Sequence, residues 1–148
     1  MLKIPYQKQE NDYYCGPAVL SSLLGYFGKN LSQKEIAKLT KTKPPPHGTE
    51  NHEMAKMSKK FGFYSKAKRN ATIKDIEQIL KKYPVIINYI EPEEDVGHFA
   101  IVLELTKNSI ILSDPWHGPK FKITQEEFLK RWHNHKNTIK HWMLEIHP

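Results

Sequence analysis

The chain has 148 residues, of which 39% are hydrophobic and 26% are charged, close to the averages of globular proteins. No apolar run approaches the roughly 20 residues of a membrane-spanning helix, so a transmembrane segment is not expected. Residues 1–6 contain no apolar block long enough for a signal peptide. We therefore expect a single domain over residues 1–148, located in the cytoplasm.

The formal net charge of +7 makes nucleic acid a partner to consider. The densest basic stretch, residues 56–69, also contains Phe61, Phe63 and Tyr64, and this combination is typical of nucleic-acid-binding surfaces. A solvated helix face that runs into a half-buried strand explains the same stretch, and we prefer this interpretation. Binding of nucleic acid is therefore not expected.

The first half of the chain predicts helices. Residues 16–27 carry apolar side chains at helical spacing, with a proline in the first turn and Gly28 after the end. Ser32 and Glu35 have the spacing of a capping box, which predicts a second helix that runs to Leu39.

The next segment, residues 41–49, contains three consecutive prolines and predicts an extended, exposed arm. A third helix is expected from about residue 50 to residue 61. Thr72, with Asp75 three residues later, predicts the cap of a fourth helix.

The second half of the chain predicts an antiparallel sheet. Five runs predict strands: residues 84–90, 98–105, 109–112, 118–123 and 140–146. The second and third runs are joined by a tight turn at residues 107–108, and Thr124 with Glu127 predicts a capped helix between the last two runs. Helices followed by strands are typical of the α+β class, because a parallel sheet requires the two to alternate.

Cys15 is the only cysteine, so the chain can form neither an intramolecular disulfide nor a multi-cysteine zinc site. It precedes Gly16 and the first predicted helix, which places its sulfur at a helix N-terminus. Unpaired backbone N–H groups there favour a negative charge on the sulfur. At this point an inert, buried cysteine explains the residue equally well.

His98 is the best candidate among eight histidines for accepting a proton from this thiol. It follows Gly97 and opens an apolar strand, so packing can hold the residue while its ring faces a cleft. A partly exposed histidine at a strand end is the alternative. Six other histidines are expected to be solvated: His47, His52, His133, His135, His141 and His147.

Asp114 ends an apolar strand, and a carboxylate in that position needs a partner because burying it unpaired is costly. His98 and Asp114 fall at the same end of the predicted hairpin. A regular two-residue turn at residues 107–108 would nevertheless put them on opposite faces of the sheet. Pairing of the two residues therefore predicts a bulge or an odd-length loop.

Gln9 lies six residues before Cys15, and its amide could join the helix N–H groups in an oxyanion hole. On position alone, Gln7 is an equal candidate. His98, Asp114 and His117 could supply three metal ligands, but no paired-histidine spacing on a helix supports such a site. We expect neither a metal nor an organic cofactor.

Four short motifs occur in a recognisable order: Gln9, Cys15-Gly16-Pro17-Ala18, Gly97-His98-Phe99-Ala100 and Asp114-Pro115. Over residues 4–123 their order and spacing resemble the bacteriocin-processing, double-glycine-type peptidases and their stand-alone relatives, within the papain-like cysteine peptidase superfamily. The resemblance implies an α+β papain-like fold, in which an N-terminal helical half packs on a C-terminal antiparallel sheet with a cleft between them.

The resemblance also implies a role for each motif residue. Cys15 would be the nucleophile, His98 the general base and then acid, and Asp114 the residue that orients His98. Gln9 and the Cys15 backbone N–H would form the oxyanion hole. The implied reaction is hydrolysis of a peptide bond through an acyl-enzyme, with a peptide or protein as substrate.

Two features depart from the transporter-borne members of that family. Tyr14 stands where those members often have aspartate, and no transporter segment follows Pro148. Cleavage after a double glycine is therefore not expected as the specific task. Two alternatives use the same framework, namely an acyl transferase or deamidase with the same triad, and a catalytically silent peptide-binding module.

Overall fold

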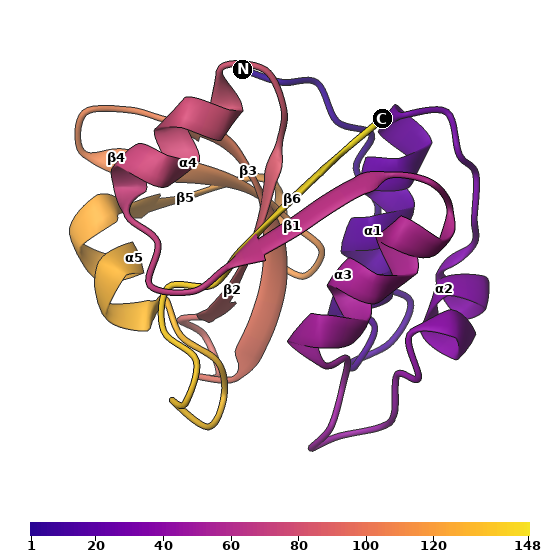
Figure 1. Cartoon of the computed structure of the whole chain (residues 1–148). Coiled ribbons are helices and arrows are strands. Elements are labelled where there is room, and N and C mark those ends of the chain that lie inside the picture. Colours follow the sequence, from indigo (N-terminus) through magenta and orange to yellow (C-terminus); the bar gives the residue numbers. More distant parts are fainter.

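The computed structural model describes all 148 residues as a six-stranded sheet with helices on both faces (Figure 1). The helices are α1 (Cys15–Tyr26), α2 (Gln33–Leu39), α3 (Asn51–Lys60), α4 (Ile73–Leu80) and α5 (Gln125–Arg131). The strands are β1 (Tyr64–Lys68), β2 (Val85–Ile90), β3 (Gly97–Leu105), β4 (Ser109–Asp114), β5 (Gly118–Thr124) and β6 (Met143–His147). Their order in the sheet is β1-β6-β2-β3-β4-β5, and every neighbouring pair is antiparallel.

The two faces of the sheet carry separate hydrophobic cores. Helices α1, α2 and α3 cover one face, and α4 and α5 cover the other (Figure 1). Because side chains alternate along a strand, Phe99 and Ile101 of β3 belong to the first core, whereas Ala100 and Val102 belong to the second. Burial on both faces explains why β2 and β3 are mostly apolar and do not alternate with polar residues.

The helix predictions are confirmed to within one or two residues. Three predicted N-terminal caps are present: the hydroxyls of Ser32, Thr72 and Thr124 accept hydrogen bonds from the backbone N–H groups of Glu35, Asp75 and Glu127. Each cap satisfies a helix N–H group that has no partner within its own helix. None of the five helices combines the length and hydropathy that crossing a bilayer requires.

The five predicted strand runs are all present, and β1 is the strand expected within residues 56–69, although it is more exposed than the half-buried strand that was predicted. Its side chains are exposed except for Ser65, because β1 is an edge strand that pairs only with β6. The sequence pattern is weak for this reason, and exposed lysines on such a strand discourage pairing with other chains. Residues 56–69 therefore form a solvated face of α3 and an exposed edge strand.

Residues 41–49 form a closed turn and not the extended arm that their prolines predict. The backbones of Lys43 and Gly48 exchange two hydrogen bonds, and the hydroxyl oxygens of Thr42 and Thr49 lie 2.6 Å apart. The prediction of an extended arm is wrong because the residues that flank the prolines retain their N–H groups, and these donate the hydrogen bonds that close the turn. Gly48 also adopts a φ of +59°, which closes the turn and which other residues rarely adopt.

The β3–β4 hairpin contains the irregularity that the sequence predicts. Near the turn, Leu105 lies opposite Ile110, which is the register of a regular two-residue turn at residues 107–108. From Val102 toward His98 the register is shifted by one residue, because Val102 lies opposite Leu112. Leu103 therefore has no partner and forms a bulge in β3. The shift places His98 and Asp114 on the same face, and the predicted bulge is confirmed.

Gly16 lies where Thr49, in the segment before α3, packs closely on α1. A Cβ atom on Gly16 would be 2.7 Å from the Thr49 Oγ1 atom and 3.1 Å from the Met54 sulfur. Gly25, in the same helix, has open space around it, and the nearest atom to a Cβ there would be Asn30 Oδ1 at 3.9 Å. The two glycines therefore provide a matched pair of substitutions.

We expect Gly16→Ala to lower the free energy of unfolding by about 1–3 kcal/mol, because the added methyl group overpacks the contact with Thr49. Gly25→Ala should raise it by up to about 1 kcal/mol, because alanine favours the helix. Denaturant unfolding of both variants measures the difference. Similar effects of the two substitutions would contradict the close approach at Gly16.

Candidate active site

Cys15 is the first residue of α1, and its side chain is half-buried against the first core. The preceding residue, Tyr14, makes no capping hydrogen bond through its side chain, and the first turn of α1 contains no acidic residue. The N–H groups of this turn are therefore not neutralised by a neighbouring side chain. They favour a negative charge on the sulfur, as the sequence predicts.

His98 lies at the start of β3 and is 4% exposed. Its Nε2 atom donates a hydrogen bond of 2.7 Å to Asp114 Oδ1. The preceding residue must be small, because a Cβ on Gly97 would lie 3.1 Å from the Cβ of His135. The ring is thus held by the carboxylate, and a loop packs against the residue that precedes His98.

Asp114 is fully buried at the end of β4 and is surrounded by hydrogen-bond donors. Its Oδ1 atom accepts from His98 and from the backbone N–H groups of Trp116 and His117, both at 2.9 Å. Its Oδ2 atom accepts from the Tyr89 hydroxyl. Burial opposes ionisation of the carboxyl group. The hydrogen bond and charge of His98, the Tyr89 hydroxyl and the backbone N–H of His117 outweigh burial and hold the pKa of Asp114 below its usual range.

The charge on His98 is governed by the same cluster. Burial disfavours the protonated ring, but the charge of Cys15 and hydrogen bonds with Asp114 and Cys15 outweigh burial and raise the pKa of His98 to about 10. The Cys15 sulfur is thus one of the groups that act on the charge of the ring. At neutral pH the ring is an imidazolium between a sulfur and a carboxylate.

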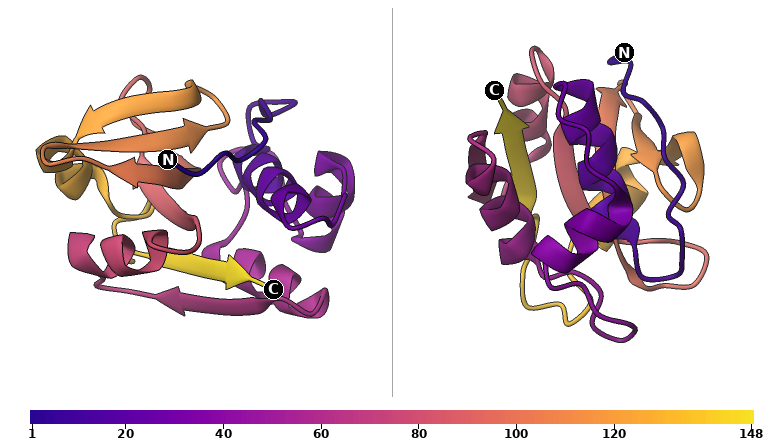
Figure 2. Two further views of the ribbon diagram at one scale, coloured as in Figure 1. Left: turned by 90° about the horizontal axis from the view of Figure 1, so that it is seen from above. Right: turned by 90° about the vertical axis from the view of Figure 1, so that its right-hand side faces the viewer.

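Gln9 is buried in the segment that leads into α1, and this segment lies between α1 and the orange strands in Figure 2. Its backbone N–H donates to the Pro115 carbonyl at 3.0 Å, next to Asp114. Its Nε2 atom donates one hydrogen bond, to the Asn11 carbonyl at 2.8 Å, and its Oε1 atom is enclosed without a partner. Gln7, the equal candidate on position alone, instead donates to Ser21 of α1.

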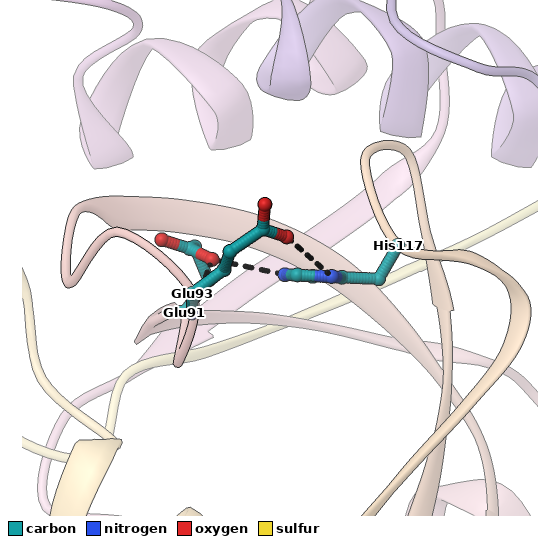
Figure 3. A group of neighbouring side chains, drawn as sticks. All are labelled: Glu91, Glu93 and His117. Carbon is teal, nitrogen blue, oxygen red and sulfur yellow. Dashed lines mark hydrogen bonds and ion pairs between the residues drawn. The ribbon is translucent and has the colours of Figure 1, made fainter.

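A second polar cluster lies beside Asp114 and consists of Glu91, Glu93 and His117 (Figure 3). The Nε2 atom of His117 lies 2.9 Å from Glu91 Oε1, and its other ring nitrogen lies 3.7 Å from Glu93. Burial disfavours the charged form of Glu91. Hydrogen bonds from the backbone N–H groups of Glu94 and Glu93 and from the His117 ring outweigh burial and hold the pKa of Glu91 below its usual range.

This cluster is the one group of side chains with the spacing to hold a metal ion. The oxygens of Glu91 already accept hydrogen bonds from protein donors, so the cluster is satisfied as a carboxylate–imidazole pair. The trio His98, Asp114 and His117, considered as ligands from the sequence, is not brought together. The ring of His117 is directed at Glu91, and only its backbone N–H reaches Asp114.

Sequence reasoning missed Tyr89, which holds the second oxygen of Asp114. Tyr89 lies in β2 directly opposite His98, so the strand pairing places its hydroxyl beside the dyad. The only signal was a tyrosine within a mostly aliphatic strand. A buried tyrosine hydroxyl requires a hydrogen-bond partner, and this requirement could have linked it to Asp114.

The remaining histidines divide into two groups. His47, His52 and His135 are exposed as expected, whereas three others are half-buried: His133, His141 and His147. The prediction of solvation is wrong for the latter group. The ring of His141 stacks on Trp132, and the ring of His147 stacks on Tyr64 and Tyr83. The apolar face of an imidazole favours such contacts.

A cysteine at a helix start, beside a buried imidazole–carboxylate pair in an α+β fold, is the arrangement of a cysteine-type peptidase. Comparison with known proteins agrees with this class. The chain belongs to the peptidase C39 family, whose sequence profile matches residues 3–140.

Known relatives and solved structures extend this result. The chain is 28% identical over 129 residues to the transport/processing ATP-binding protein ComA of Streptococcus pneumoniae. The matched region covers 86% of this chain but only 17% of that relative. The structure is similar to the peptidase domain of Streptococcus ComA, a bi-functional ABC transporter involved in a quorum sensing pathway. The TM-score is 0.81, with 24% identity and 99% coverage of both chains.

A second similar structure is that of a double glycine motif protease from an AMS/PCAT transporter in complex with the leader peptide. Its TM-score is 0.74, with 22% identity and coverage of 99% of this chain and 92% of that one. Both likenesses confirm the predicted α+β fold, with its helical half packed on an antiparallel sheet.

The pKa of His98 provides a test of the cluster. Replacement of Cys15 by alanine removes the sulfur charge and its hydrogen bond, while the effect of burial remains. We therefore expect the pKa of His98 to fall below the value of about 10 in Cys15→Ala. An NMR titration of the His98 ring in both proteins measures the change, and an unchanged pKa would show that the sulfur and the ring do not interact.

Proposed function

We propose that this protein hydrolyses a peptide bond, with Cys15 as nucleophile, His98 as general base and then acid, and Asp114 as the residue that orients His98. The observation that carries the proposal is the buried His98–Asp114 hydrogen bond of 2.7 Å beside the helix-start cysteine. Membership of the peptidase C39 family supports it independently.

The first chemical step is attack by the Cys15 sulfur on the carbonyl carbon of the scissile bond. Because His98 uses Nε2 to bind Asp114, its Nδ1 atom is left to hold the proton of the thiol, which moves to the ring before the attack and leaves the sulfur as a thiolate. The carbonyl oxygen acquires negative charge as the new C–S bond forms. We assign the Cys15 backbone N–H and the Gln9 amide as donors to this oxygen, since Gln9 Nε2 makes only one hydrogen bond within the chain.

The intermediate then collapses and the C–N bond breaks. His98 gives its proton to the departing amine, and the acyl group remains on Cys15 as a thioester. Water attacks this thioester while His98 accepts one of its protons, which releases a carboxylic acid and restores the thiol. Asp114 keeps its charge throughout and stabilises the imidazolium in each step.

The proposed substrate is a peptide or protein. One similar structure is that of a double glycine motif protease in complex with a leader peptide. Although the sequence alone does not favour this cleavage, the similarity makes peptides with two glycines before the scissile bond the first substrates to assay, together with variants in which alanine replaces each glycine. Mass spectrometry of the products distinguishes a free carboxylic acid, formed by hydrolysis, from an amide formed by acyl transfer.

We expect Cys15→Ala and His98→Ala to abolish peptide cleavage and labelling by an epoxide inhibitor of cysteine peptidases. Asp114→Asn should lower kcat by about 10²–10⁴-fold, because the imidazolium loses its charged partner. The rate of cleavage and the mass of the labelled protein measure these effects.

His47→Ala provides the control, because the side chain of His47 is exposed in the turn of residues 41–49. It should retain the activity of the unmodified protein. Full labelling of Cys15 in His98→Ala would contradict the assignment of His98 as the general base.

A further inference from the structure

The segment that carries Gln9 is held by one buried side chain, that of Gln33, the first residue of α2. Gln33 is 3% exposed. Its Oε1 atom accepts from the Glu10 N–H at 3.0 Å, and its Nε2 atom donates to the Lys8 carbonyl at 3.0 Å. One amide therefore binds the backbone immediately before and immediately after Gln9, as a neighbouring strand would.

Gln33 is in turn fixed by a buried polar network. Its Nε2 atom also donates to Gln7 Oε1 at 3.0 Å, so both of its N–H groups are used. Gln7 donates to the Ser21 hydroxyl of α1 at 2.8 Å, and that hydroxyl donates to the Leu31 carbonyl at 2.7 Å. The network anchors the N-terminal segment to both α1 and the turn before α2.

The opposite side of Gln9 is held by the sheet. The Gln9 N–H donates to the Pro115 carbonyl at 3.0 Å, one residue after Asp114. The side chain of Gln9 has a single hydrogen bond of its own, to the nearby Asn11 carbonyl. The position of its amide therefore depends on where its backbone is held, between Gln33 and the end of β4.

We propose that Gln33 is a positioning residue for the oxyanion hole, which fixes the backbone around Gln9 so that the Gln9 amide meets the tetrahedral intermediate. The proposal rests on the proposed function, because it requires Gln9 to bind the oxyanion. Only an amide of this length supplies both the acceptor for Glu10 and the donor for Lys8. Methionine has a similar length and supplies neither.

Gln33→Met tests the proposal through three measurements. We expect kcat to fall by about 10–100-fold with a smaller change in KM, since loss of a whole oxyanion-hole donor costs about 10²–10³-fold. The affinity for a peptide aldehyde should fall by a similar factor, because its adduct with Cys15 places an oxygen in the hole. The rate of Cys15 alkylation by iodoacetamide should not change, because that displacement forms no oxyanion.

Gln125→Met is the matched control. Gln125 is also the first residue of a helix, α5, and its amide also donates to a backbone carbonyl, that of Thr106 at 2.6 Å. This contact lies at the β3–β4 turn, at the opposite end of the hairpin from His98. Gln125→Met should keep the kcat, the aldehyde affinity and the alkylation rate of the unmodified protein.

Gln9→Ala completes the design. If Gln33 acts through Gln9, the double variant with Gln33→Met should lose no more kcat than Gln9→Ala alone. Additive losses would overturn the proposal, as would a fall in the alkylation rate of Gln33→Met equal to its fall in kcat. An unchanged aldehyde affinity in Gln9→Ala would overturn both this proposal and the role of Gln9, while the variants of Cys15 and His98 test the triad separately.

Gln33→Glu serves as a second variant if Gln33→Met does not fold. Glutamate keeps an acceptor for the Glu10 N–H but loses both donors, so we expect the same loss of kcat and aldehyde affinity without loss of alkylation. Activity and aldehyde affinity equal to those of the unmodified protein would overturn the proposal. Circular dichroism of each variant establishes that it is folded before the kinetics are compared.

Discussion

The structure of the site depends on one buried negative charge, the carboxylate of Asp114. A charge without solvent must be compensated by donors, and the protein provides an imidazole, a tyrosine hydroxyl and two backbone N–H groups. These donors come from β2, β3 and the turn after β4. The carboxylate thus fixes three elements of the sheet relative to one another, and it fixes the orientation and charge of His98 in particular.

The helical side is attached to this charged centre through the N-terminal segment. Tyr6 donates to the Asp114 carbonyl and Gln9 donates to the carbonyl of the next residue, while Gln33 holds the same segment from α2. The start of α1, and with it Cys15, follows a few residues later. The hydrogen bonds of the N-terminal segment, together with the apolar cores, therefore determine the position of the Cys15 sulfur relative to the His98 ring.

Much of this arrangement could be predicted from the sequence, because its signals are local. The start of an apolar helix and a carboxylate at the end of an apolar strand singled out Cys15 and Asp114, and the unfavourable strand register predicted an irregularity, which the structure places at Leu103. The roles of Tyr89 and Gln33 depend on contacts between distant segments, which carry no local pattern. The closed turn at residues 41–49 was missed because proline was weighed without the donors that flank it.

The central claim is that the Cys15 sulfur and the His98 imidazolium form one interacting pair, and the reactivity of the sulfur tests it most directly. We predict that iodoacetamide alkylates Cys15 at neutral pH faster than it alkylates a free cysteine peptide, and that His98→Ala removes this excess. A rate in the unmodified protein no greater than that of the free peptide would contradict the account.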